Sequence, residues 1–300
     1  MMALVGTGLA TVALGLLAYD LAGPSAGAVL GGARRLGGGP PTQGGPARGG
    51  IYARTTRGAR IYLKTPRLRG LLALNLAAAA AGAMVIVNTV VYVRSLLGRS
   101  NNDVALGLAA FGAGSMLTAS LLPGILERVG DRRVMLGASS LLVAALLAMA
   151  AVTLSPGVDH WLALLGVWAV MGVSYSAVFA SSGRLLRRSA SPADRSAVFA
   201  AQFALSHICW LVTYTVAGSL GAAIGVPWTL VGLAGLAALG VAGGLLFWPS
   251  KDPDEIPHEH PELPRDHPHQ REGAPLAAGA GHVHDVVIDD LHLNWPRPGA

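Results

Sequence analysis

Long apolar runs separated by short polar turns dominate the chain. Seven stretches reach the roughly 20 residues that a helix needs to cross the hydrocarbon core of a bilayer. They are predicted at Met1–Tyr19, Leu71–Val93, Val104–Leu126, Val134–Leu154, Trp161–Gly183, Ser196–Leu220 and Trp228–Trp248. A segment inside lipid must satisfy its own backbone polar groups, so the pattern predicts an all-α transmembrane bundle of about seven helices.

The organisation follows from the segments outside this pattern. Residues 1–30 hold a single predicted helix, which could instead be a signal peptide, although no basic residues precede its apolar run. Residues 31–69 are rich in glycine, proline and arginine without any acidic residue, which predicts a flexible basic linker. Residues 70–250 form the six-helix block. Residues 251–300 are rich in proline, histidine and acidic residues and are predicted to be disordered.

Composition and charge support the membrane interpretation. Apolar residues make up 52% of the chain, charged residues 13%, and the net charge is +6. The tail after Ser250 has four basic and ten acidic residues, so the rest of the chain is strongly positive. The basic residues gather in the linker and in the turns Glu127–Arg133 and Arg184–Arg195, which places these on the cytoplasmic side of a plasma membrane, together with the C-terminus. This is the charge pattern of a bilayer protein and not a nucleic-acid surface.

One turn carries a motif. Residues Pro123 to Leu136 read PGILERVGDRRVML, which resembles the cytoplasmic loop signature Gly-x-Leu-Ala-Asp-Arg-x-Gly-Arg-Arg of the major facilitator superfamily, in its weaker C-terminal copy. Arg128, Gly130 and Arg132 match this signature, Glu127 replaces its aspartate, and Pro123 replaces its first glycine. The resemblance covers about residues 60 to 250.

The resemblance implies a bundle of the major facilitator type and a gate that holds one side of an alternating-access transporter closed. A carboxylate at Glu127 would serve as a clamp if it faces the N-terminus of a neighbouring helix. The alternative is a charged turn with no role beyond orientation. The predicted gating residues are Glu127, Arg128, Gly130, Asp131, Arg132 and Arg133.

The same resemblance implies a partner. The family has twelve helices in two halves with the substrate between them, whereas this chain corresponds to a C-terminal half and one preceding helix. It is therefore expected either to pair with a separate N-terminal half or a second copy, or to be an inactive fragment.

Polar side chains within spans are costly unless they face protein or a water-filled path, so they are candidates for a substrate or proton path. The predicted set is Asn88, Tyr175, Gln202, His207, Trp210 and Tyr214. Helical spacing puts Phe203, His207, Trp210 and Tyr214 on one stripe, which is not expected to face lipid. His207 could couple transport to protons, or it could make a structural hydrogen bond between helices.

The tail offers a different chemistry. Imidazoles interleaved with carboxylates suit nickel, cobalt or zinc, although the spacing matches no closed structural site. The candidate ligands are His258, His260, His267, His269, His282 and His284.

Together these features predict a secondary transporter of the major facilitator type, not an enzyme. It would be an exporter of a small solute or a metal ion and is expected to need no cofactor. The alternative is a membrane-anchored metal-binding or sensing protein that acts through its tail.

Overall fold

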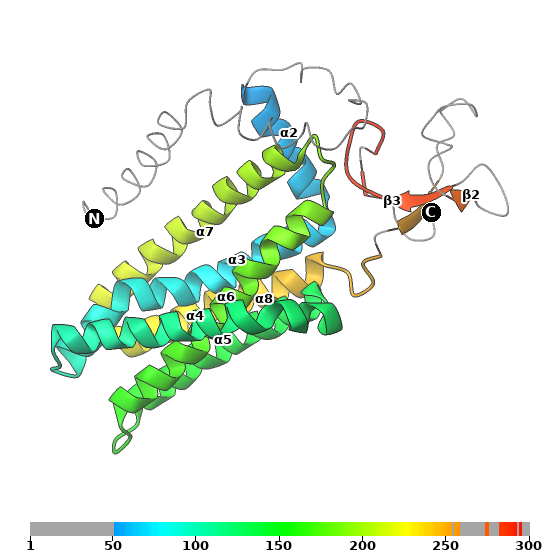
Figure 1. The fold of residues 1–300 in the computed structure, drawn as a ribbon. Coiled ribbons are helices and arrows are strands. Elements are labelled where there is room, and N and C mark those ends of the chain that lie inside the picture. The colour runs from blue at the N-terminus through cyan, green and yellow to red at the C-terminus, as the bar shows by residue number, and fades with distance from the viewer. Residues whose placement is uncertain (1–50, 254, 259–273, 276–281, 293, 296–300) are drawn as a thin grey trace, which may run out of the picture. The chain divides into compact units, whose positions relative to one another are not determined.

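The computed structural model describes residues 51–253, 255–258, 274–275, 282–292 and 294–295 (Figure 1). Its helices are α2 (Ile51–Lys64), α3 (Pro66–Ala83), α4 (Asn101–Val129), α5 (Asp131–Leu154), α6 (His160–Arg188), α7 (Arg195–Ile224) and α8 (Val226–Phe247). Its strands are β1 (Glu255–His258), β2 (Ala274–Pro275) and β3 (His282–Asp285).

Six helices of the described residues are long and apolar enough to cross a membrane. They are α3 to α8. Wider π-helical turns extend α3 to Asn88. Each overlaps one of the six spans predicted after residue 70, so that prediction is confirmed. The seventh predicted span, Met1–Tyr19, lies outside the described residues.

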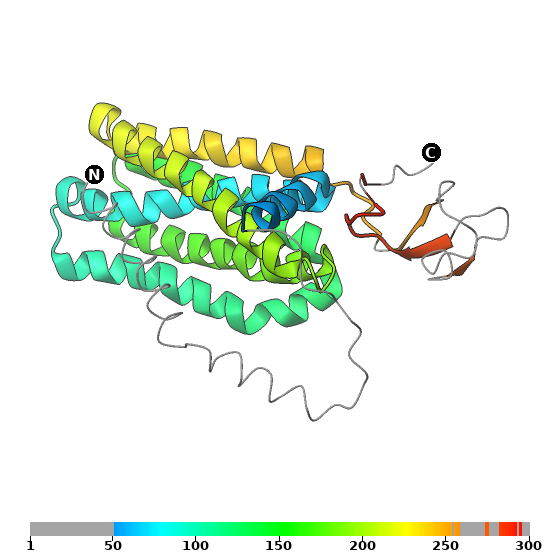
Figure 2. The same ribbon diagram turned by 90° about the horizontal axis from the view of Figure 1, so that it is seen from above.

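The helices α3 to α8 lie side by side, and α3 packs against α5, α6, α7 and α8 (Figure 2). The small side chains Ala77–Ala81 are all fully buried in α3 and let its neighbours approach closely. On α8, a Cβ built on Gly240 would lie 2.5 Å from the carbonyl oxygen of Ala73. The small residues of these two helices therefore serve helix packing.

The helices α4 and α6 touch through their backbones. A Cβ on Gly114 would collide with the carbonyl oxygen of Ala169, and a Cβ on Gly172 would collide with that of Phe111. Across the same contact, the Ser115 hydroxyl donates a 3.1 Å hydrogen bond to the Gly172 carbonyl. The two helices therefore form a close pair in which side-chain volume is excluded.

The prediction of a flexible linker is wrong for residues 51–64, which form α2. This helix packs on α7 because its apolar residues Ile61 and Tyr62 are fully buried. Tyr62 donates a hydrogen bond to Gln202, and a Cβ on Gly58 would collide with the Ala197 backbone. The density of arginines in this segment hid an amphipathic helix.

The described residues of the tail, which the sequence predicts to be disordered, include three short strands. Strands β1, β3 and β2 form an antiparallel sheet in that order, with Glu255 opposite Asp285 and His258 opposite His282. Ile256, Val286 and Ile288 are buried. Ile288 belongs to the same apolar cluster as the core of the helices, so part of the tail is packed on the bundle.

Candidate functional site

A network of charges built on largely buried carboxylates joins the helices at one end of the bundle. At this end α4, α6 and α8 finish and α3, α5 and α7 begin; we call it the basic end. It carries Arg67, Arg128, Arg132, Arg133, Arg184, Arg187 and Arg188.

Asp131 is the most enclosed carboxylate of the network. It is the first residue of α5, and its side chain is 2% exposed. Its Oδ1 accepts a 2.9 Å hydrogen bond from Nε of Arg184, and Nη2 of the same arginine lies 2.9 Å away. Its Oδ2 lies 3.6 Å from Nη1 of Arg188. Two arginines of α6 therefore hold the start of α5.

Arg188 extends the network to the chain that follows α8. Its Nη2 donates a 2.7 Å hydrogen bond to Oδ2 of Asp252, which also accepts one of 3.0 Å from Nε1 of Trp248. Nη1 of Arg67, on α3, lies 3.7 Å from Oδ1 of Asp252. Five charged residues thus connect α3, α5, α6 and the end of α8. We call them the gate network: Asp131, Asp252, Arg67, Arg184 and Arg188.

The helix dipoles favour this arrangement. Asp131 lies in the first turn of α5, where the dipole stabilises an anion, and Arg188 lies in the last turn of α6, where it stabilises a cation. Burying these charges is costly unless they stay paired, so loss of one partner leaves the others uncompensated. The gate network can therefore hold the basic end in one defined state.

The predicted gating residues fall into two groups, those that are exposed and those that make contacts within the bundle. Glu127, the expected clamp, is exposed, and no ion pair with it is found among the described residues; Arg128 and Arg133 are also exposed. Asp131 makes the buried contacts instead, while Nε of Arg132 donates a 3.0 Å hydrogen bond to the Trp248 carbonyl. In the sequence, the role of Asp131 is indicated by its position directly after Gly130, the turn glycine that precedes α5.

Gly130 forms the turn between α4 and α5. Its φ is +81°, in the left-handed region that favours glycine, and it allows α5 to begin with Asp131. The predicted role of this glycine as part of the gating turn therefore has a conformational basis.

An aromatic cluster lies between α4, α6 and α7. The ring of Tyr175 has its centroid 5.4 Å from that of Phe111, 4.6 Å from that of Phe179 and 6.2 Å from that of Trp210. The Trp210 ring also lies 5.0 Å from that of Tyr214. The structure thus brings together three predicted residues, Tyr175, Trp210 and Tyr214, and adds Phe111 and Phe179, which carry no polar group that would mark them in the sequence.

A glycine of α3 makes room for this aromatic cluster. A Cβ built on Gly82 would lie 2.5 Å from Cη2 of Trp210 and 3.2 Å from a ring carbon of Tyr175. The rings therefore rest directly on the α3 backbone.

The other predicted path residues lie apart from these rings. Asn88 is buried, and its Nδ2 donates a 3.4 Å hydrogen bond to the Ala217 carbonyl. Gln202 is buried and accepts from Tyr62. Both groups have structural partners, so the structure gives them a role in joining α7 to α3 and α2.

Two members of the predicted stripe, Phe203 and His207, are not covered by the other described helices. Both are exposed on the surface of the described bundle, where their ring centroids lie 4.0 Å apart. His207 turns Nδ1 back to the Phe203 carbonyl oxygen, 2.7 Å away. Its predicted alternative, an interhelical hydrogen bond, is not found either, because its partner belongs to the same helix.

The tail histidines are described only in part. The backbone register places His258 opposite His282 on neighbouring strands, while His260, His267 and His269 lie outside the described residues. Within the described positions no group of three potential metal ligands is close enough to hold an ion.

The six spanning helices define the chain as a multi-pass α-helical membrane protein. The sequence profile of the Major Facilitator Superfamily matches residues 71–288, which is well over half of the chain. The chain therefore belongs to the Major Facilitator Superfamily, as the resemblance of its loop motif predicts. No curated protein matches the chain closely enough to serve as a relative. Members of this family are transporters and not enzymes, so the chain is a membrane transporter of the major facilitator type.

Proposed function

We propose that the chain exports a small, ring-containing solute from the cytoplasm across the plasma membrane by alternating access. The aromatic cluster carries this proposal. Five rings from three helices offer flat apolar faces, and such faces bind aromatic or lipophilic groups and weak organic cations. The middle of every described span lacks Asp, Glu, Lys and Arg. A neutral or weakly basic solute fits this lining better than a strongly charged one.

The gate network has a matching role in the proposal. When Asp131 is paired with Arg184 and Arg188, the cytoplasmic ends of α5 and α6 are held together and this side is closed. Opening requires these pairs to separate or to exchange partners. The basic residues of this end support its cytoplasmic placement, since such residues accumulate on that side of a membrane.

We propose that the chain works together with a second six-helix half. The apolar window of α3 is 72% buried, whereas those of α4 and α7 are only 17% and 22% buried. Phe111 belongs to α4, and Trp210 and Tyr214 belong to α7. A solute held between these helices and a partner half, from a separate chain or a second copy, would contact these three rings.

His207 is the candidate for proton coupling. Its exposure on the same helix as Trp210 would let it exchange protons with a water-filled path between the halves. Replacement by glutamine keeps a polar group of similar size. We expect His207→Gln to remove the pH dependence of transport, and unchanged pH dependence would leave this residue only its contact with Phe203.

The experiment uses vesicles that contain the full chain and an acridine dye, which is flat, aromatic and weakly basic, followed by its fluorescence. We expect dye movement to fall at least about tenfold in Trp210→Ala, because the truncation removes the ring shared by Tyr175 and Tyr214. The matched control is Phe203→Ala, an exposed aromatic residue of the same helix. Equal rates in the two variants would contradict a binding role for the aromatic cluster.

The same vesicles test the partner. Movement with this chain alone would exclude the inactive fragment, and movement only after a second half is supplied would support assembly from two halves.

Metal binding by the tail is a second candidate function, favoured by the register that sets His258 opposite His282. Calorimetric titration of the detergent-solubilised chain with nickel, cobalt or zinc tests it. Micromolar binding that is lost when both histidines are replaced by alanine would support a metal exporter or a metal sensor. No heat at micromolar metal would exclude it.

A further inference from the structure

Helix α2 presents a row of cations to the tail. Arg57, Arg60 and Lys64 are spaced by three and four residues, which places them on one side of the helix. We call these three residues the basic stripe. The helix ends one residue before α3 begins, so the basic stripe lies beside the first turn of a membrane span.

A segment of the tail lies on the basic stripe; we call its described residues, 289–292 and 294–295, the strap. Asp290 places Oδ1 2.9 Å from Nη1 of Arg57 and 3.8 Å from Nη2 of Arg60. Nζ of Lys64 donates a 3.0 Å hydrogen bond to Oδ1 of Asn294. The strap therefore contacts all three cations of the basic stripe in sequence order.

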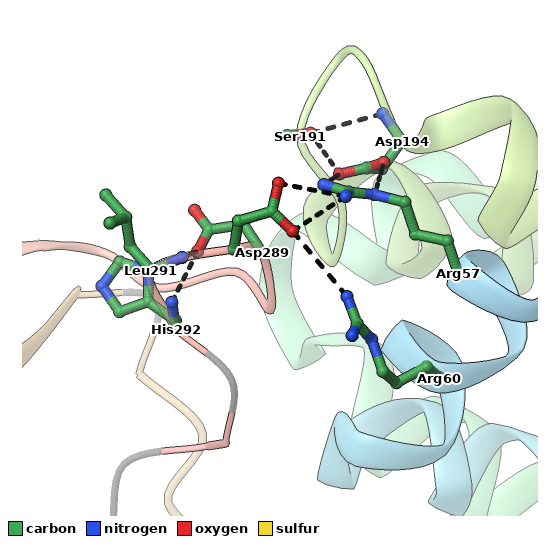
Figure 3. A network of polar contacts seen from close by, with 8 residues as sticks. Arg57, Arg60, Ser191, Asp194, Asp289, Leu291 and His292 are labelled. Atoms are coloured by element: carbon green, nitrogen blue, oxygen red, sulfur yellow. Dashed lines mark hydrogen bonds and ion pairs between the residues drawn. The ribbon is translucent and has the colours of Figure 1, made fainter. Parts of the chain in front are cut away.

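A turn built on Asp289, which lies beside Leu291 and His292 (Figure 3), precedes the contact with the basic stripe. Oδ1 of Asp289 accepts hydrogen bonds from the backbone N–H groups of Leu291 and His292, at 2.8 and 2.6 Å. Burial opposes ionisation of Asp289, but hydrogen bonds from the side chain and backbone of His292 outweigh it and lower its pKa to about 2. The turn is thus a stable local unit in which only the next residue, Asp290, reaches out to α2.

The strap brings fewer negative charges to this contact than the basic stripe has positive ones. Asp290 is the only carboxylate that the strap offers to these three cations, and its side chain is 74% exposed. Arg57 is also held from the opposite side by Asp194, whose hydrogen bond raises the pKa of this arginine. From the strap, Arg60 gains a long ion pair and Lys64 a neutral amide. Exposed ion pairs of this kind contribute little and weaken with salt, so Asp290 is a replaceable ligand of the basic stripe.

Trp295, by contrast, anchors the end of the strap by its contact with the buried Arg67, whose guanidinium lies 5.1 Å from the ring centroid.

We propose that the basic stripe is a binding surface for anionic phospholipid headgroups and that Asp290 and Asn294 of the strap occupy it only when such lipids are absent. A headgroup phosphate accepts several charge-assisted hydrogen bonds from guanidinium and ammonium groups. Basic residues beside a span are attracted to anionic lipid by about 1 kcal/mol each, which is roughly fivefold in affinity. The exposed apolar side chain of Leu63 lies between Arg60 and Lys64 in sequence and suits the lipid boundary.

The test measures the distance between strap and basic stripe directly. Spin labels are attached at Leu63→Cys and Leu291→Cys in a Cys209→Ser background, because both positions are exposed and neither side chain belongs to the ion pairs. The full chain is placed in phosphatidylcholine vesicles, with or without phosphatidylglycerol. We expect one short distance in phosphatidylcholine and an undocked fraction at least about fivefold larger with phosphatidylglycerol.

Two variants and one added anion sharpen the test. Arg60→Gln with Lys64→Gln keeps the Arg57–Asp194 pair and should abolish the effect of phosphatidylglycerol on the distance. The matched control is Arg69→Gln, an exposed arginine beside Phe247, which should leave that effect intact. An identical distance in both lipids would overturn the proposal. Undocking by inorganic phosphate in phosphatidylcholine vesicles, at matched ionic strength, would overturn the lipid as the ligand.

Discussion

Two aspartates with arginine partners illustrate how burial sets the role of a charge in this molecule. The Asp131 side chain is 2% exposed and sits between two arginines of α6, whereas the Asp290 side chain is 74% exposed and reaches two arginines of α2. Both make ion pairs of 2.9 Å. Equal distances therefore do not indicate equal energies: both arginines are partly exposed, but water surrounds the Asp290 carboxylate and not the Asp131 carboxylate.

In the two proposals, the pairs of Asp131 form a gate and those of Asp290 form a removable contact. The gate network can hold two helices in one arrangement, and it releases them only when a substantial cost is met. In the second proposal, Asp290 leaves the basic stripe under modest changes of salt or lipid. The predictions below test this contrast.

Asp131→Asn should destabilise the protein by about 1–2 kcal/mol, because the buried side chain loses its charge-assisted contacts with Arg184 and Arg188, whose own side chains are partly exposed. Reversible unfolding in detergent measures the free-energy change. Glu127→Gln is the matched comparison, since it neutralises an exposed carboxylate four residues earlier and should change stability by less than about 0.5 kcal/mol. If Glu127→Gln lowered stability more than Asp131→Asn, Glu127 would be the clamp, as the loop motif predicts.

Gly82→Ala tests whether buried volume is as restrictive as buried charge. The added methyl group would lie 2.5 Å from the Trp210 ring, so we expect a loss of about 1–3 kcal/mol and weaker dye movement. Gly112→Ala, on α4, has open space at the new methyl group and should be neutral or slightly stabilising. Thermal unfolding of both variants measures the difference, and equal melting temperatures would show that the aromatic cluster tolerates displacement.

Asp290→Asn should lower the free energy of unfolding by less than about 1 kcal/mol, because its ion pairs are exposed. Its effect should appear in the position of the strap. The spin-label distance should lengthen in low salt for the variant but only in high salt for the parent chain. A destabilisation as large as that of Asp131→Asn would contradict the contrast between the two aspartates.

Acidification should have the smallest effect. The pKa of Asp289 is lowered to about 2 in the folded turn, so ionised Asp289 stabilises the turn fully above its ordinary pKa of about 4. That contribution is lost only as the pH falls from about 4 through 2. The spin-label distance should therefore not change because of Asp289 between pH 7 and pH 5, in low salt and phosphatidylcholine. A change that Asp289→Asn removes would show that this carboxylate titrates at higher pH.

The sequence predicts the spans well because apolar length and terminal charge are local signals. It also locates the turn around Gly130 and three of the aromatic residues. It does not predict that Asp131 replaces Glu127 in the buried contact, because the choice depends on where α6 places Arg184 and Arg188. Partners that lie more than fifty residues away leave no trace in the loop motif.

Two further differences have the same origin. The arginines of α2 suggest a linker, yet Ile61 and Tyr62 bury one side of it on α7. His207 shares a helical stripe with Trp210, but spacing along one helix cannot tell which part of the stripe a neighbour covers. In both cases packing between distant helices decides the outcome.

The central claim is that Asp131 closes the basic end above the aromatic cluster. A cysteine introduced by Ser181→Cys, at a buried position of α6 between Tyr175 and Arg188, reports on this closure in a Cys209→Ser background. Its reaction rate with a charged methanethiosulfonate reagent is measured in inside-out membrane vesicles, with and without the further substitution Asp131→Asn. The account predicts slow reaction while Asp131 is present and a rate at least about tenfold higher in the Asp131→Asn variant. Equal rates in the two proteins would contradict it.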